Sequence, residues 1–100
     1  MDVGTTIKQF RKKIGVNQQE LADKSNITQA YLSQIENNKK DPNLSTLAAI
    51  ADSLGVPLPI LFFSSVSESD VPEHKKEAYA IMAPAINEMI SSLFLNGNAN

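Results

Sequence analysis

The sequence predicts an all-α protein, and three features of the chain support this class. Apolar residues recur every three or four positions in successive segments, which places them on one face of a helix. Residues that favour helix ends stand at the borders of these segments, and no stretch shows the alternation typical of a half-buried strand. With 100 residues, 42% of them hydrophobic, the chain can form one small core with a short appendage.

The first three predicted helices are short and closely spaced. The first covers about 5–14, and the second opens at Asn17, an N-cap residue that forms a capping box with Glu20. The third begins after Thr28, another residue that favours the N-cap. Asn26 lies in the turn between the second and third helices, where we expect a positive φ that only Gly, Asn and Asp adopt readily.

Two further helices complete the predicted N-terminal domain. Asn43 caps the fourth, which carries apolar residues at helical spacing and ends at Gly55. The apolar stretch that follows contains Pro57 and Pro59, consistent with a fifth helix that has proline near its start. We therefore expect one helical domain over residues 1–63, which we call the head.

Beyond the head we expect a polar linker at 64–72, a helix at 73–95 and a disordered tail at 96–100. Pro84 lies inside the predicted helix and removes one of its backbone hydrogen bonds, so it either kinks the helix or divides it into two. The helix also carries apolar residues at alternating spacings of three and four, an a/d seam for a partner helix. Two outcomes are open for this surface, homodimerisation or packing back on the head, and we favour dimerisation through Tyr79, Met82, Ile86, Met89, Ile90 and Leu93.

Composition argues against several classes of protein and site. The chain has no cysteine for disulfides or thiolate metal sites, and its single histidine, His74, has no ligand partners at metal spacing. No catalytic cluster and no glycine-rich phosphate loop is visible, so we expect no enzyme, no metal and no cofactor. The longest apolar run, 56–63, is too short to span a bilayer, and no signal peptide is recognisable, which predicts a cytoplasmic protein without membrane contact.

Charge divides the chain into two parts. The net charge is −2, but residues 1–40 hold seven basic and four acidic side chains, a net of +3. Residues 41–100 hold two basic and seven acidic side chains, a net of −5. Because local charge decides whether a surface can face phosphates, the first part is the candidate nucleic-acid binder.

The outward face of the third predicted helix has the chemistry of a base-reading surface. Its side chains are short amides, a hydroxyl and a methyl group, with no Lys or Glu among them: Gln29, Ala30, Ser33 and Gln34. Glutamine can pair with the N6 and N7 edge of adenine, and a methyl group can contact thymine. This face is therefore the candidate for contact with DNA bases.

These segments resemble the Cro/C1-type helix-turn-helix of the Xre family of transcriptional regulators. The resemblance rests on NQQELA at 17–22, TQAYLSQIEN at 28–37 and DPNL at 41–44, and it covers about residues 5–62. It implies a five-helix, lambda-repressor-like DNA-binding domain with its third helix in the major groove. It also implies base contacts by the four residues above, an ion pair between Arg11 and Glu36, and phosphate contacts by Asn17, Gln18, Tyr31, Asn37 and Lys39.

We therefore expect a sequence-specific regulator of transcription that binds double-stranded DNA. The favoured form is a repressor that binds a pseudo-palindromic operator as a homodimer, and an antirepressor or a toxin is a further possible partner. Two alternatives remain: an antitoxin whose C-terminal segment covers a toxin, and a protein-interaction module that has lost DNA binding. RNA is a weaker candidate because the major groove of A-form RNA is too narrow for the third helix.

Overall fold

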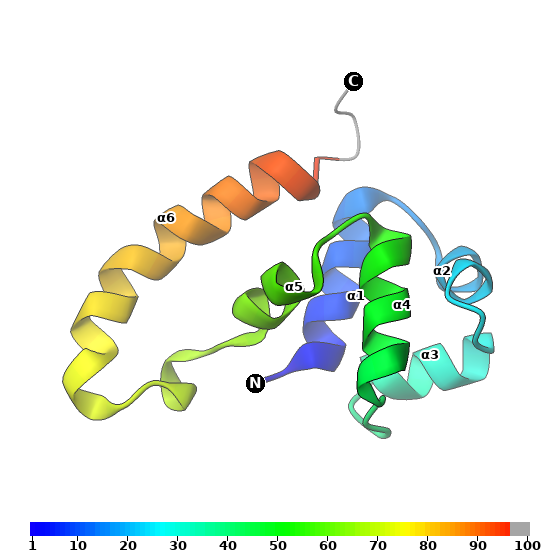
Figure 1. The fold of residues 1–100 in the computed structure, drawn as a ribbon, viewed down its shortest axis with the longest axis horizontal. Coiled ribbons are helices and arrows are strands. Elements are labelled where there is room, and N and C mark those ends of the chain that lie inside the picture. The colour runs from blue at the N-terminus through cyan, green and yellow to red at the C-terminus, as the bar shows by residue number, and fades with distance from the viewer. Residues whose placement is uncertain (97–100) are drawn as a thin grey trace.

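The computed structural model describes residues 1–96, and this part of the chain is entirely helical (Figure 1). The all-α class predicted from the sequence is thus confirmed. The elements, in order, are α1 (Val3–Ile14), α2 (Gln18–Lys24), α3 (Gln29–Glu36), α4 (Leu44–Leu54), α5 (Leu58–Ser65), two single 3-10 turns, η1 (Glu68–Asp70) and η2 (Glu73–Lys75), and α6 (Lys76–Phe94). Of the tail expected at 96–100, all but the first residue lies outside the described part.

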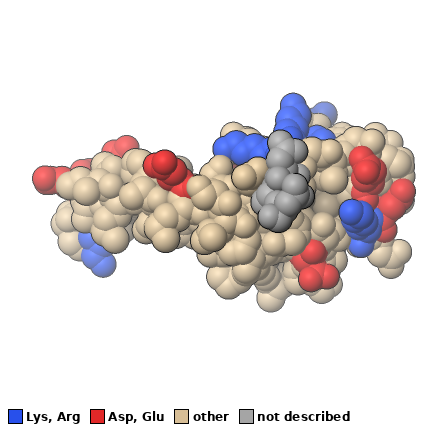
Figure 2. All heavy atoms as spheres, turned by 90° about the horizontal axis from the view of Figure 1, so that it is seen from above, with Lys and Arg blue, Asp and Glu red and all other residues tan. Residues whose placement is uncertain are grey.

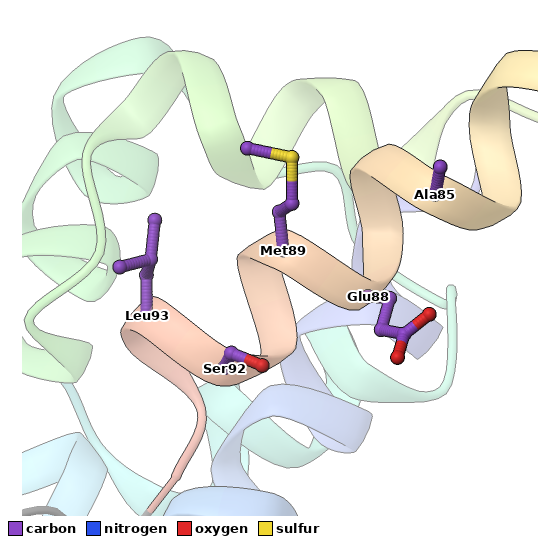
Figure 3. Close-up of a pocket in the computed structure, with 5 residues that line it drawn as sticks. All are labelled: Ala85, Glu88, Met89, Ser92 and Leu93. Carbon is purple, nitrogen blue, oxygen red and sulfur yellow. The ribbon is translucent and has the colours of Figure 1, made fainter.

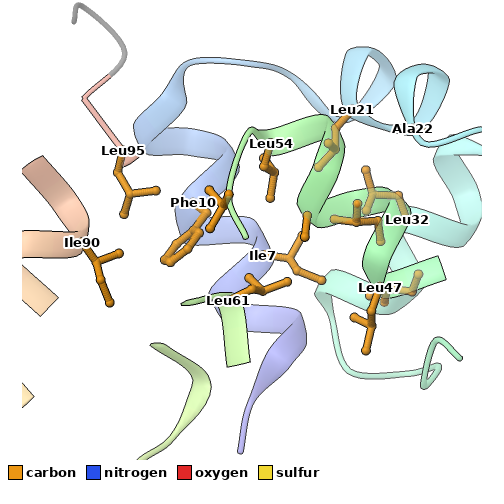
Figure 4. Close-up of a cluster of buried hydrophobic side chains, with 14 residues drawn as sticks. Ile7, Phe10, Leu21, Ala22, Leu32, Leu47, Leu54, Leu61, Ile90 and Leu95 are labelled. Carbon is orange, nitrogen blue, oxygen red and sulfur yellow. The ribbon is translucent and has the colours of Figure 1, made fainter. Parts of the chain in front are cut away.

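The head is built around one apolar core to which α1 to α5 all contribute (Figure 4). The largest of its side chains are sealed from solvent, with less than 2% of their surface exposed: Ile7, Leu21, Leu32, Ile35, Ile50 and Leu61. Complete burial of an aliphatic side chain contributes about 1.5–3 kcal/mol. These contacts fix α3 against α1 and α2, so its outer face has a defined orientation.

The start of α1 lies two residues earlier than the sequence predicts. The carboxylate of Asp2 accepts a hydrogen bond from the backbone N–H of Thr5 at 2.9 Å, so Asp2 is the N-cap and the helix opens at Val3. The two additional helical residues, Val3 and Gly4, bring Gly4 against the end of α3. A Cβ atom at this glycine would overlap the carbonyl oxygen of Ile35 and lie 2.5 Å from Oδ1 of Asn38. The absence of a side chain at residue 4 therefore sets how closely α1 and α3 approach.

The segment between the head and α6 differs from the expected polar linker. Ser64 and Ser65 belong to the last turn of α5, and the two 3-10 turns occupy much of the rest. In η1, the carboxylate of Asp70 accepts hydrogen bonds from the α-amino group of Met1 at 2.8 Å and from the backbone N–H of Ser67 at 2.8 Å. These bonds lower the pKa of Asp70 to about 2. The long C-terminal helix consequently begins at Lys76 and not at residue 73.

The α6 helix continues through Pro84, so the proline does not divide it into two helices. Proline removes the bond that its own N–H would donate to the carbonyl of Ala80. Both residues are exposed, so water can satisfy that carbonyl. The chain therefore keeps a single helix of 19 residues despite the proline.

The two sides of α6 have different surroundings. Ile90 and, just after the helix, Leu95 are buried in the core beside Phe10 (Figure 4). Ile86 and Phe94 pack against the same core, while the Tyr79 hydroxyl donates a 2.8 Å hydrogen bond to the carbonyl of Val66. This side of α6 therefore packs back on the head, which is one of the two outcomes that the sequence left open. Ile90, expected on a dimer surface, is a core residue because its side of the helix faces α1.

No single helix among residues 1–96 is long and apolar enough to cross a membrane. Only α4 and α5 taken together reach the required length and composition. They are bent by 101° relative to each other, and both contribute to the core of the head.

We expect Gly4→Ala to destabilise the protein by up to about 2 kcal/mol. Alanine favours helix by about 1 kcal/mol over glycine, but overlap with a backbone oxygen forces α1 and α3 apart, at a cost of about 1–3 kcal/mol. Urea unfolding followed by circular dichroism measures the difference. Lys12→Ala, an exposed change on the same helix, is the control and should stay within about 0.5 kcal/mol of the wild type. A Gly4→Ala protein more stable than the wild type would contradict the close contact.

Candidate nucleic-acid interface

A helix-turn-helix is formed by α2, a tight turn and α3. At α2, Asn17 accepts a hydrogen bond from the backbone N–H of Glu20 at 2.8 Å, and Glu20 accepts one from the backbone N–H of Asn17 at 3.0 Å, which is the predicted capping box. Thr28 caps α3 by accepting from the N–H of Tyr31. Asn26 has a φ of +58°, so the left-handed conformation predicted for the turn is confirmed.

The structure brings the four candidate base-reading residues together on the outer side of α3. Gln29, Ala30 and Gln34 are exposed, and Ser33 is half-buried. The opposite side of the same helix buries Leu32 completely. An eight-residue helix with one face in the core and the other in solvent can enter a groove while its position stays fixed by packing.

The five candidate phosphate-facing residues lie at the start of α2, on α3 and just beyond the end of α3. Lys39 is exposed just beyond the end of α3, and its backbone N–H donates to the carbonyl of Gln34 at 2.8 Å. Asn37 is exposed beside it and Tyr31 is half-buried. Asn17 and Gln18 lie at the start of α2, where Asn17 serves as the cap. The Gln18 side chain is half-buried and points towards Glu36, while its backbone remains at the start of α2.

A buried hydrogen-bond network centred on Glu36 ties α3 to α1 and α2. The Arg11 guanidinium makes a two-pronged contact with the Glu36 carboxylate, with Nε donating at 2.8 Å and Nη2 at 3.0 Å. Arg11 also donates to the carbonyl of Val16 at 3.1 Å, and Gln18 Nε2 donates to Glu36 at 3.0 Å. Only 3% of Glu36 is exposed, so its charge is compensated almost entirely by these neighbours.

Two further links escaped the sequence prediction. Gln29 Nε2 donates to Oε1 of Gln18 at 3.4 Å, so a candidate base-reading side chain is connected through Gln18 to Glu36. Beyond α3, Asn38 has a φ of +58° and donates to Oδ1 of Asp2 at 2.9 Å. Hydrogen bonds from Thr5 and Asn38 lower the pKa of Asp2. The sequence shows only that these positions are polar. It does not indicate which side chains form hydrogen bonds with each other, because the partners are up to 36 residues apart.

Nothing in this site resembles a metal centre. Within the described residues, no group of three or more His, Cys, Asp or Glu side chains could hold a metal ion. The available chemistry is hydrogen bonding from amides and hydroxyls together with positive charge. That chemistry suits recognition of a polar surface.

Comparison with known proteins agrees with this geometry. Residues 7–61 match the helix-turn-helix family, more than half of the chain. The immunity repressor protein of Bacillus phage phi105 is 45% identical over 56 residues, which cover 56% of this chain and 39% of that repressor. The transcriptional regulator ImmR of Bacillus subtilis is 31% identical over 93 residues, covering 93% of this chain and 68% of ImmR.

A solved structure shows a similar fold over most of the chain. The crystal structure of the clp gene regulator ClgR from Corynebacterium glutamicum superposes with a TM-score of 0.63 at 22% identity, covering 92% of this chain and 90% of ClgR. This likeness concerns the fold, and the family match places the chain among helix-turn-helix domains. The chain belongs to the Cro/C1-type helix-turn-helix family, as its sequence motifs predicted. It spans less than two fifths of the length of the phi105 repressor, so the similarity concerns the helix-turn-helix region of that protein.

We expect Arg11→Met or Glu36→Leu alone to cost about 3–5 kcal/mol, because either change leaves the other charge buried without its partner. The double variant should lose less than the sum of the two single losses, since it removes both charges together. Urea unfolding of the four proteins closes this double-mutant cycle. Strictly additive losses would show that the two side chains do not interact.

Proposed function

We propose that this chain is a sequence-specific, double-stranded DNA-binding regulator of transcription, and that it acts as a repressor. The observation that carries the proposal is the outer face of α3, where Gln29, Ala30 and Gln34 are exposed on a helix anchored on its opposite side. The phi105 relative, itself named an immunity repressor, supports repression as the direction of control.

In this proposal the base edges are read by Gln29, Ala30, Ser33 and Gln34. The hydrogen bond from Gln29 to Gln18 limits the freedom of the Gln29 amide before DNA arrives. A side chain that is already oriented loses less conformational entropy when it pairs with a base. Lys39, exposed beside the end of α3, supplies charge to a phosphate, and further phosphate contacts come from Asn17, Gln18, Tyr31 and Asn37.

We further propose that two copies bind a pseudo-palindromic operator. One head with a single reading helix offers few base contacts, and joining two heads raises the effective concentration of the second once the first is bound. The outward side of α6 provides a candidate interface, with large apolar residues 57–72% exposed: Ile81, Met82, Met89 and Leu93. Contiguous exposed apolar surface of this kind is uncommon on soluble monomers and marks interaction sites.

The shape of this stripe supports a helix as its occupant. Met89 and Leu93 project from the same side of α6, with Ala85 one turn before them (Figure 3). Together with Glu88 and Ser92 they line an open hollow of about 470 Å³. A second copy of α6, related by a two-fold axis, would place its own methionine and leucine side chains there. We therefore place the interface on the outward residues and not on Ile90.

Substitution of Gln29 tests the reading face. On the operator selected from a random pool of duplexes, Gln29→Ala should weaken binding by about 1–3 kcal/mol while non-specific binding stays nearly constant. Gln19→Ala, an exposed glutamine of α2 that bonds Asp23, is the matched control and should have little effect. Lys39→Ala should instead weaken binding to every duplex and lower the salt dependence by about one counterion. An unchanged sequence preference in Gln29→Ala would refute this placement of α3.

Substitution of Met89 tests the dimer. Burial of a methionine contributes about 1.5–3 kcal/mol and burial of a lysine charge is unfavourable, so Met89→Lys should weaken dimerisation at least about tenfold. Ala80→Lys adds the same charge to an exposed position off the stripe and should leave the dimer intact. Sedimentation velocity over a range of concentrations measures both. Point changes are preferable to deletion of α6, which would also remove Ile90 from the core. A wild-type protein that stays monomeric would exclude this interface.

A further inference from the structure

A small polar cleft lies where α6 crosses the head, and nothing proposed above uses it. Its walls come from three helices, α1, α5 and α6, and its volume is about 160 Å³. The apolar floor is formed by Phe10, Ile90 and Leu95. The cleft is separate from the outer face of α3 and from the outward stripe of α6, whose hollow is lined by other residues.

The polar residues of the cleft are all able to donate hydrogen bonds. They are Gln9 and Lys13 of α1, Ser64 of α5, and Asn87 and Ser91 of α6. Among residues 1–96, no carboxylate lines the cleft, although the chain as a whole is acidic. Among the described residues, none of these five side chains makes a hydrogen bond to another protein group, and those of Gln9, Lys13 and Asn87 are exposed, so their donors are available to a ligand.

Ser64 provides a second and independent observation. Its hydroxyl oxygen is buried and has no hydrogen-bond partner. The next residue, Ser65, shows the usual solution for a buried helical serine, since its hydroxyl donates to the carbonyl of Leu61 at 2.8 Å. A buried hydroxyl without a partner is unfavourable, so a hydrogen-bonding group that reached it from the cleft would be stabilised there.

The charge around the cleft indicates which kind of ligand it can bind. The last turn of α1 carries Arg11, Lys12 and Lys13, and of these only Arg11 is neutralised by an ion pair within the described residues. Figure 2 looks onto the end of the head where α1 finishes, and basic side chains gather there. Positive charge with neutral donors and no acid matches an oxyanion. The volume is below the roughly 300 Å³ of common ligand pockets, so the anion must be small.

We propose that this cleft binds a small oxyanion, a phosphate or a carboxylate, which Lys13 pairs with and the amides and hydroxyls orient. Because α1 and α5 lie on one side of the cleft and α6 on the other, the bound anion bridges the head and α6. Its occupancy stabilises the position of α6 on the head. The cleft is thus a ligand site that controls how firmly the C-terminal helix is held.

The test is a titration of the full ¹⁵N-labelled chain with sodium phosphate and, separately, sodium acetate, at an ionic strength kept constant with sodium chloride. We expect saturable shifts of the side-chain amides of Gln9 and Asn87 and of the backbone amides of Ser64 and Ser91. Saturation with phosphate alone assigns the site to phosphate, and saturation with acetate alone assigns it to carboxylates.

Two variants of equal charge separate this site from general attraction of anions. Lys13→Gln should weaken the binding at least about tenfold, whereas Lys12→Gln, the neighbouring exposed lysine, should leave it within about twofold. Ser64→Ala should weaken it as well, because the buried hydroxyl no longer requires a partner. The proposal is overturned if neither anion gives saturable shifts at these residues, or if the two lysine variants lose binding equally.

Discussion

The carboxylate of Glu36 is the group on which the arrangement of the head depends. It lies at the end of α3 and is buried, so it must find its partners inside the protein. Arg11 reaches it from α1 and Gln18 from α2, and each contact fixes one helix relative to the next. Apolar packing alone tolerates small shifts between helices, whereas a two-pronged ion pair has one geometry. The direction in which α3 presents its outer face therefore follows from a polar contact on its inner side.

Gln18 joins this constraint to the proposed reading surface. Its amide nitrogen donates a hydrogen bond to Glu36, and its amide oxygen accepts one from Gln29. The same short chain of hydrogen bonds thus runs from the interior to a side chain proposed to contact DNA. Gln29 is the first residue of α3, and at the C-terminal end of the helix Asn38 and Gly4 hold α1 close, through a hydrogen bond to Asp2 and through the lack of a Cβ atom. Both ends of the helix are fixed, by different means.

The sequence was informative where structure depends on neighbouring residues. Local backbone chemistry determines the helix caps at Asn17, Thr28 and Asn43 and the left-handed conformation of Asn26. Each was predicted from the residue and its nearest neighbours in sequence. Contacts between distant segments were different. Both Ile90 and Met89 were expected on one dimer surface, although only the three-dimensional path of the linker determines that Ile90 faces α1 and Met89 faces water. The position of Asp70 in a 3-10 turn likewise depends on Met1, 69 residues away.

Pro84 gives α6 an uneven stiffness along its length. The half after the proline is anchored by Ile90 and Phe94, whereas the half before it contacts η1, η2 and, through Tyr79, the carbonyl of Val66. A helix bends most readily where a backbone hydrogen bond is missing. If the outward stripe joins two copies, Met82 and Met89 lie on opposite sides of this weak point. Met89 and Leu93 lie on the half that is anchored to the head, so a partner bound to them is held directly to the core, and a bend at Pro84 would move only the half that carries Ile81 and Met82.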